Sequence, residues 1–174
     1  MSELDEFRAA KNEFFRTDSQ SPLLPDQQAT FTGLQYYDEN SALALELEPE
    51  TFAQQELIEM QTSTGNVATY VRWARISFEV GGEPAELTVF RDAQSGALFL
   101  PFQDANAGGE TYGAGRYLDI EPGEDGRLLV DFNYAYNPYC AYNERWSCPI
   151  PPPENRLRVA IHAGEKTFEG VHEL

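Results

Sequence analysis

The chain has 174 residues, of which 41% are hydrophobic and 13% aromatic, so it can bury a packed core and is unlike a disordered chain. Its 29 acidic and 12 basic residues give a formal net charge of −17. Nucleic acids and anionic membrane surfaces bind clustered Lys and Arg, so this balance argues against both as partners. No apolar run approaches the roughly 18 residues of a membrane span, and residues 1–15 lack the pattern of a signal peptide. We therefore expect a cytoplasmic protein.

The acidic residues are spread along the whole chain, whereas an acidic tail that binds a partner would form a block. One interpretation is a soluble surface on which like charges prevent association. We favour adaptation to a salt-rich cytoplasm, where screening over about 3 Å at roughly 1 M salt makes a dense carboxylate surface tolerable. The sequence thus predicts a halophilic protein.

Residues 2–17 are predicted to form an amphipathic helix. Ser2 is a suitable N-cap, and acidic residues follow it in the first turn, where the helix dipole favours them. Residues 18–30 are polar and contain two prolines, so they are predicted to be a loop. The helix carries an apolar stripe that needs a core, made of Leu4, Phe7, Ala10 and Phe14.

The rest of the chain shows the patterns of antiparallel strands. Gly81-Gly82 lies between two stretches rich in β-branched and aromatic residues, which predicts a hairpin. The cleanest alternation of apolar and polar residues lies at 156–162, which predicts a strand there. Strands are predicted at 43–48, 55–62, 67–80, 87–90, 97–102, 117–120, 128–133 and 156–162, and the tail 165–174 is a candidate edge strand.

These patterns predict a mainly β fold, an antiparallel barrel or sandwich of about seven to nine strands with one N-terminal α-helix. The pattern alone does not choose between the barrel and the sandwich. The length of the chain favours one domain over residues 1–174, with the helix at 2–17 and a β domain at 31–174.

The stretch 131–155 is unusual in composition, because it holds both cysteines, four of the nine tyrosines and five of the eleven prolines. It is too irregular for a helix, too rich in proline for a central strand and too apolar for a flexible linker. We therefore predict an ordered loop over 133–155. Its aromatic side chains either pack the loop against the sheet or line a pocket.

Cys140 and Cys148 are predicted to have a structural role. A disulfide between them would close a short loop and stabilise the fold by ~2–3 kcal/mol in the chain-entropy model. A cytoplasm keeps thiols reduced, so two buried thiols are the favoured alternative. Only two histidines accompany the cysteines, His162 and His172, and the Cys-x7-Cys spacing is not that of a zinc site. We predict no metal and no cofactor.

Residues 103–115 are rich in glycine, but the run lacks the Lys-Ser/Thr pair of a phosphate-binding loop and a strand follows it. Tight turns with positive φ explain the glycines better. Arg116 ends the run and is one of few cations in an acidic chain. It either holds a ligand carboxylate or pairs with Asp119 or Asp131.

Two carboxylates at the ends of the loop, Asp131 and Glu154, are the candidate general acid and base. The favoured alternative is that they satisfy backbone groups of the loop, because a long loop has many such groups to satisfy. The candidate ligand-binding residues are Arg116, Tyr112, Asn133, Asn137 and Asn155.

Several motifs match one known family. They are Asp131–Asn133, Asn137–Tyr142, Cys148–Asn155, Ala163–Glu165 and, upstream, Leu98–Gly108 and Glu110–Asp119. On these motifs the chain resembles the family catalogued as domain of unknown function 1684 over nearly its whole length. The resemblance implies a stand-alone or near stand-alone domain and no established reaction. It also implies that one unit is formed by Glu110, Arg116, Asp131, Asn133, Asn137, Cys140, Cys148, Glu154 and Asn155.

Three functions remain open. The first is binding of a small molecule between residues 103–116 and 131–155. The second is a hydrolase-like enzyme at the same place, with Asp131 or Glu154 as acid or base and Arg116 as an anion anchor. The third is a structural or interaction module without a ligand. The sequence does not predict the oligomeric state.

Overall fold

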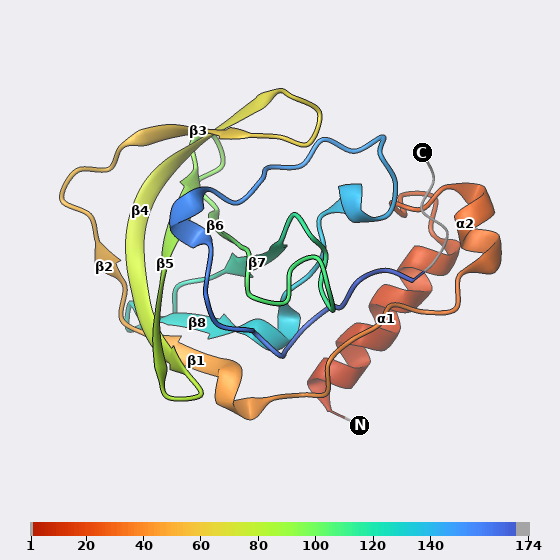
Figure 1. The fold of residues 1–174 in the computed structure, drawn as a ribbon, viewed down its shortest axis with the longest axis horizontal. Helices are drawn as coiled ribbons and strands as arrows, with labels where there is room; N and C mark the ends of the chain where they lie inside the picture. The colour runs from red at the N-terminus through yellow and green to blue at the C-terminus, as the bar shows by residue number, and fades with distance from the viewer. Residues whose placement is uncertain (1, 170–174) are drawn as a thin grey trace.

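The computed structural model describes residues 2–169 and shows an N-terminal helix beside antiparallel sheets (Figure 1). The predicted fold class, mainly β with one N-terminal helix, is confirmed. Helices and strands follow in the order α1 (Glu3–Thr17), α2 (Pro25–Thr30), β1 (Ala44–Leu47), β2 (Glu50–Thr51), β3 (Leu57–Gln61), β4 (Val67–Val80), β5 (Glu83–Asp92), β6 (Leu98–Phe102), β7 (Arg116–Ile120) and β8 (Leu128–Asp131). Short 3-10 helices occur at η1 (Ser41–Leu43), η2 (Phe132–Tyr134), η3 (Tyr139–Ala141) and η4 (Pro153–Asn155).

The larger sheet contains six strands in the order β2-β4-β5-β6-β7, and β3 also pairs with β4. Its longest hairpin joins β4 to β5 at the predicted turn, where Gly81 and Gly82 have φ values of 58° and 86°. Residues with a side chain rarely adopt this left-handed conformation, which explains the two glycines. A register shift between Arg72 and Ala74 bends β4, and the hairpin is long and curved in Figure 1.

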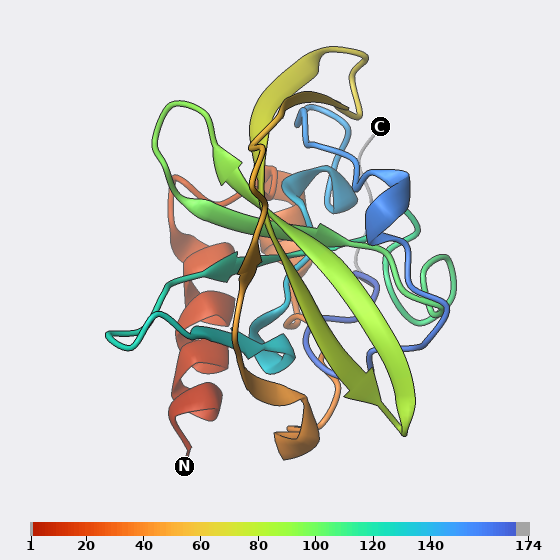
Figure 2. The same ribbon diagram turned by 90° about the vertical axis from the view of Figure 1, so that its left-hand side faces the viewer.

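A second sheet contains β1 and β8 only. Both sheets send side chains into one core, where Ile76 and Leu100 from the larger sheet meet Val130 from the smaller one. Figure 2 shows the larger sheet from the side of β2 and β4, with α1 farther from the viewer. The strands within residues 2–169 form two sheets and no closed barrel, so the sandwich is the closer of the two predicted alternatives.

Helix α1 begins as predicted, because the Ser2 hydroxyl accepts a hydrogen bond from the Asp5 N–H and Asp5 in turn accepts from the Ser2 N–H. Its buried side chains are Leu4 and Phe15. The predicted stripe was therefore partly wrong, since Phe7 is 44% exposed. Phe15, and not Phe7, anchors the helix in a second apolar cluster with Leu23, Leu34 and Tyr142.

The predicted loop at 18–30 contains a helix, α2, which begins at Pro25. Proline is compatible with the first turn of a helix, where its missing N–H has no partner to lose. Gln27 on this helix is buried and donates to the Tyr142 carbonyl at 2.7 Å. Tertiary packing thus stabilises a segment of only 6 residues.

The predicted strand at 156–162 was wrong, because only Arg156 forms a bridge, to Gln103. The alternation does report burial, since Ile161 is fully buried. The neighbouring segment supplies only some backbone partners, since the Leu157 N–H donates to the Gln103 carbonyl at 2.7 Å and the Val159 carbonyl accepts from the Ala105 N–H at 3.0 Å. Side chains supply the others. The Ile161 N–H donates to the Asp104 carboxylate at 2.7 Å, and its carbonyl accepts from Arg116 at 3.0 Å.

The candidate edge strand at 165–174 is also limited to one bridge, between Tyr36 and Glu165, and residues 170–174 lie outside the described part of the chain. Between residues 2 and 169, no helix combines the length and the apolar character needed to cross a membrane.

Candidate functional site

Arg116 lies at the start of β7 and is completely enclosed, with 1% of its surface exposed. Its guanidinium donates to the Asp104 carboxylate at 3.3 Å and to the carbonyls of Ala163 at 2.5 Å and Glu165 at 3.0 Å. Burial lowers the pKa of Arg116, and the charge of Asp104 opposes that shift. Its role as a ligand anchor stays a prediction. The predicted alternative, a pairing with Asp119 or Asp131, was wrong, because the carboxylate that pairs with Arg116 belongs to Asp104.

A second buried centre surrounds Glu165, which is 1% exposed. Its carboxylate pairs with Lys11 of α1 and accepts from the Tyr142 hydroxyl at 2.8 Å and the Asn137 N–H at 3.2 Å. The Asn137 amide donates to the Lys166 carbonyl at 3.0 Å. Burial raises the pKa of Tyr142 well above its ordinary value, and Glu165 adds to that shift. Asn137 therefore joins the loop to the C-terminal segment, and Glu165 of that segment connects both to α1 through Lys11.

Asp131 and Asn133 act together at the end of β8. Asp131 Oδ1 accepts from the Asn133 N–H at 3.0 Å and so begins η2. The Asn133 side chain pairs with the backbone of Asn40, donating to its carbonyl at 2.9 Å and accepting from its N–H at 2.8 Å. Asp131 also lines a groove of about 460 Å³ that contains other acidic residues, including Glu121.

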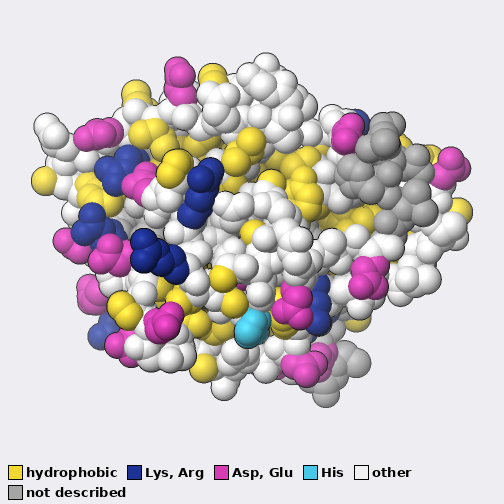
Figure 3. All heavy atoms as spheres, viewed as in Figure 1, with side chains coloured by type: hydrophobic (Ala, Val, Ile, Leu, Met, Phe, Trp, Pro, Cys, Tyr) yellow, Lys and Arg dark blue, Asp and Glu magenta, His cyan; other side chains and the backbone are white. Residues whose placement is uncertain are grey.

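Glu154 lies beside β4 and β5, whereas Asp131 lies at the end of β8. It forms a bidentate pair with Arg72, with Nη2 at 2.8 Å, and accepts from Thr88 Oγ1 at 3.1 Å. The hydrogen bond from Arg72 to Glu154 raises the pKa of Arg72. Figure 3 shows cationic and acidic side chains interleaved over this part of the surface. The structure therefore places Asp131 and Glu154 in separate networks.

Asn155 is fully buried and bonds to the backbones of two strands, β5 and β6. Its amide donates to the carbonyls of Thr88 at 2.8 Å and Pro101 at 2.7 Å, and its Oδ1 accepts from the Thr88 N–H at 2.8 Å. Through these bonds it attaches η4 to β5 and β6.

Replacing Asn155 by alanine is expected to lower the free energy of unfolding by about 2 kcal/mol, because three buried backbone groups lose their partner. Urea unfolding followed by circular dichroism measures this. Asn106→Ala is the control, since Asn106 is only partly buried and its amide contacts the Tyr37 hydroxyl at 2.9 Å near the surface. An equal loss in both variants would contradict the structural role of Asn155.

The two cysteines lie together and both are free thiols. The Cys140 N–H donates to Cys148 Sγ at 3.3 Å, and the Tyr112 hydroxyl lies 3.7 Å from Cys140 Sγ. Both cysteines are buried, with 6% and 7% of their surface exposed. Tyr112, a predicted ligand-binding residue, therefore contacts a thiol, and its role toward a ligand stays a prediction.

A groove of about 520 Å³ lies beside this thiol pair, which we call the aromatic groove. It lies between α1, β7 and the segment 136–149. Lys11 and the Asp119 carboxylate also line it, and Asp119 accepts from the Tyr136 hydroxyl at 3.0 Å. Cys148 and Pro149 complete its wall. The aromatic residues that line it are Phe7, Tyr117, Tyr136, Tyr139 and Trp146.

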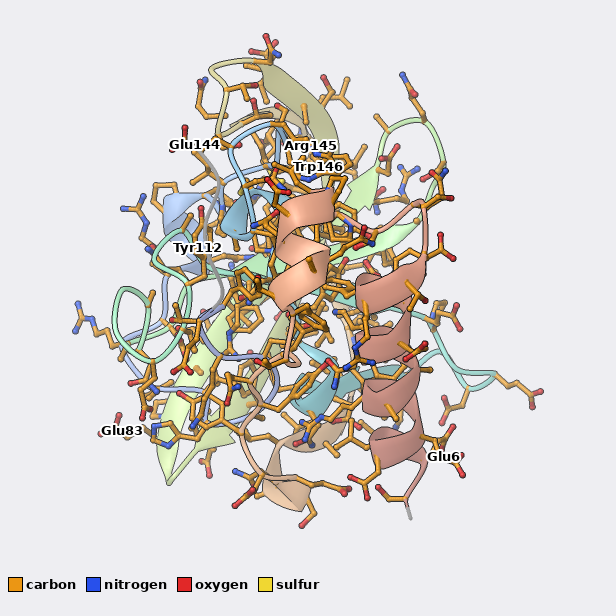
Figure 4. All side chains as sticks on the ribbon, turned by 90° about the vertical axis from the view of Figure 1, so that its right-hand side faces the viewer. Glu6, Glu83, Tyr112, Glu144, Arg145 and Trp146 are labelled. Carbon is orange, nitrogen blue, oxygen red and sulfur yellow. The ribbon has the colours of Figure 1, made fainter. Side chains whose placement is uncertain are left out.

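The rings of the groove are oriented by defined contacts. Tyr139 packs edge-on against Trp146, with ring centroids 5.1 Å apart, and Tyr117 packs edge-on against Tyr136 at 5.9 Å. The Trp146 indole N–H donates to the Pro22 carbonyl at 3.1 Å. Figure 4 shows Trp146 next to Arg145 above α2. The loop thus presents ordered ring faces to solvent.

The predicted site was placed between residues 103–116 and 131–155, and the structure distributes the predicted residues over several networks. Arg116, Asn137 and the Glu165 centre are neighbours, whereas Asn133 and Asn155 fasten other parts of the chain. Sequence reasoning missed the contribution of α1 and β7 to the groove. The sequence carried no signal for this, because Phe7 stood on a stripe that was expected to be buried, and only the structure shows it 44% exposed.

The sheets, the N-terminal helix and the hydrogen-bonded loop over 133–155 define a class of mainly β proteins with an N-terminal helix and a long ordered loop. The family described as Protein of unknown function (DUF1684) matches residues 29–166, and the chain belongs to that family. The resemblance inferred from the motifs is thereby confirmed. No curated protein matches the chain.

The chain is also similar to an uncharacterised protein of Haloarcula marismortui, whose structure was solved by solution NMR. The two share 37% sequence identity, and the match covers 94% of this chain and 92% of that one, with a TM-score of 0.71. The fold described above is therefore shared with a protein of experimentally determined structure.

Proposed function

We propose that the protein binds a small molecule in the aromatic groove, and that the ligand is a flat aromatic ring that carries a cationic group. The observation that carries this proposal is the set of five aromatic side chains around one groove of about 520 Å³. Ring faces attract other rings and cations, and ligand pockets combine such apolar walls with few polar groups. The proposed site uses the 131–155 loop, as predicted, but α1 and β7 replace residues 103–116.

The charged groups in and around the groove indicate whether the ligand is a cation or an anion. Among residues 2–169, Lys11 is the one cation that lines the groove, and Glu165 already pairs with it. Asp119 is exposed and points its carboxylate to the Tyr136 hydroxyl on the groove wall. The net charge of −17 also raises the local concentration of cations. A cation is therefore favoured over an anion.

The test uses tryptamine and indole-3-acetate, which share one ring system and carry opposite charges. Tryptamine is expected to shift backbone NMR resonances of residues 136–149 and of β7, and to bind at least about tenfold more tightly than indole-3-acetate at moderate salt. Trp146→Ala is expected to weaken tryptamine binding by about tenfold, because one ring face is lost. The matched control is Leu57→Ala, since Leu57 is 68% exposed on β3 and does not line the groove.

Two results would contradict the proposal. One is that tryptamine leaves the groove resonances unchanged at millimolar concentration. The other is that Leu57→Ala weakens binding as much as Trp146→Ala does. In either case the exposed Phe7 and Tyr139 would favour the alternative of an interaction module. The hydrolase alternative requires Asp131 or Glu154 beside the ligand, and neither lines the aromatic groove.

We also propose that the protein works in a salt-rich cytoplasm, without nucleic acid or membrane as a partner. The support for this is the dispersed acidic charge and the similarity to a protein from the halophile Haloarcula marismortui. Unfolding by urea at several KCl concentrations tests it, and stability is expected to rise with salt because repulsion between carboxylates is screened.

A further inference from the structure

We propose that Cys140 and Cys148 form a dithiol that a hydroperoxide oxidises to an intramolecular disulfide. This modification site is independent of the proposed ligand. It rests on the position of the two sulfurs, on the polar groups around them and on the access that the aromatic groove provides.

The first step is the proximity of the two thiols. They hydrogen-bond to each other, and the Cys140 N–H also donates to Cys148 Sγ at 3.3 Å. The chain between them begins at η3 and returns at Trp146, where the indole N–H is fixed to Pro22. The fold therefore holds the sulfurs next to each other without a disulfide bond between them.

The second step is the surroundings of the sulfurs. An inert buried cysteine has apolar neighbours, whereas here the Tyr112 hydroxyl lies 3.7 Å from Cys140 Sγ. The Cys148 N–H donates to Ser63 Oγ at 3.1 Å, and the Ser63 hydroxyl in turn donates to the Trp146 carbonyl at 3.1 Å. The pKa of Cys140 is lowered to about 6, chiefly by the hydrogen bond with Cys148 and also by Tyr112 and Ser63, while burial opposes the shift.

The third step is access. Cys148 lines the aromatic groove, and its neighbour Ser147 is exposed. A hydroperoxide as small as hydrogen peroxide can enter a groove of about 520 Å³ and reach its wall at Cys148, whose sulfur accepts a hydrogen bond from the Cys140 N–H. Larger oxidants are excluded by the burial of both cysteines.

The chemistry then proceeds in two balanced steps. The Cys140 thiolate attacks one oxygen of hydrogen peroxide, the O–O bond breaks, and hydroxide leaves, which gives a sulfenic acid on Cys140. The Cys148 sulfur attacks the Cys140 sulfur, the S–O bond breaks, and water leaves with the Cys148 proton. Two thiols are oxidised to one disulfide, and one peroxide is reduced to two water molecules after hydroxide takes up a proton.

The experiment treats the folded protein in high-salt buffer with equimolar hydrogen peroxide, followed by alkylation in denaturant and intact mass spectrometry. The wild type is expected to lose 2 Da, about the mass of two hydrogens, and to lose both alkylation sites. Cys148→Ser is expected to gain about 16 Da and to react with dimedone at Cys140. Cys140→Ser is the matched control and is expected to stay unmodified under the same conditions.

The pH profile gives a second readout. Oxidation of the wild type is expected to be half-maximal at a pH below the ordinary thiol pKa of about 8.5, because the lowered pKa of Cys140 keeps its thiolate populated to lower pH. The other titratable groups that act on the pair or line the groove beside it are Cys148, Tyr112, Tyr117, Glu144, Lys11 and Asp119.

Three outcomes would overturn the proposal: two alkylatable thiols in the treated wild type, a disulfide only between separate chains, or a disulfide only in urea. Equal reactivity of the two single variants would overturn the assigned roles of the cysteines. Peptide mapping of the oxidised wild type decides the question even where a serine variant fails to fold. Tryptamine binding is measured separately, so the two proposals fail independently.

Discussion

Replacing Asp104 by alanine is expected to lower the free energy of unfolding by about 3–5 kcal/mol, the largest effect of any single substitution considered. Asp104 and Arg116 pair at 3.3 Å, and each side chain is only 1% exposed. The substitution leaves the Arg116 guanidinium buried without its counter-charge. It also removes the acceptor of the Ile161 N–H, which donates to the Asp104 carboxylate at 2.7 Å. Urea unfolding at constant high salt measures the loss.

Glu154→Ala is the matched control for this ion pair. Glu154 pairs with Arg72 at 2.8 Å, so its geometry is as good, but the two side chains are 33% and 24% exposed. Water and salt screen an exposed pair, so the expected loss is about 0–1 kcal/mol. Equal losses in the two variants would show that burial of the Arg116 pair adds nothing.

Gly164→Ala is expected to lower the free energy of unfolding by about 3 kcal/mol or more. Gly164 has a φ of 83°, and a methyl group there would lie 2.8 Å from the carbonyl oxygens of Phe132 and Ala135. The left-handed conformation alone costs about 1–2 kcal/mol, and overpacking against backbone adds about 1–3 kcal/mol. Thermal and urea unfolding of the variant measure the sum.

Gly126→Ala separates the two contributions. Gly126 has the same φ of 83°, but nothing lies within 4 Å of an added methyl group. Only the conformational part remains, so a loss of about 1–2 kcal/mol is expected. A loss in Gly164→Ala no larger than that in Gly126→Ala would contradict the close approach of the 163–165 segment to the loop.

The sheet was predictable where local chemistry determines it. Gly81-Gly82 marked the central hairpin, and stretches rich in β-branched and aromatic residues marked β4 and β5, because such side chains pack well on a pleated surface. The segment 156–162 shows the limit of this reasoning. Its alternation reflects burial, and its backbone bonds partly to the backbone of residues 103–105 and partly to the side chains of Asp104 and Arg116, all of which lie far away in the sequence.

The candidate site was predictable in its chemistry and not in its geometry. The density of tyrosine and tryptophan in 131–155 indicated a packed or pocket-lining loop, and the structure contains both arrangements, since Tyr142 is fully buried whereas Tyr139 is 36% exposed. No local pattern could show that α1 would bring Phe7 and Lys11 to the same groove, because that depends on how the helix docks.

The pairing of Lys11 with Glu165 joins residues that are 154 positions apart. During synthesis, the helix that carries Lys11 is made well before its buried partner. At about 5–20 residues per second, the ribosome needs roughly 8–30 s to cover that separation. Phe15, which is 1% exposed in the finished protein, has no complete cluster to enter during this time. The acidic residues of the same helix would keep the nascent chain in solution until Glu165 has been synthesised.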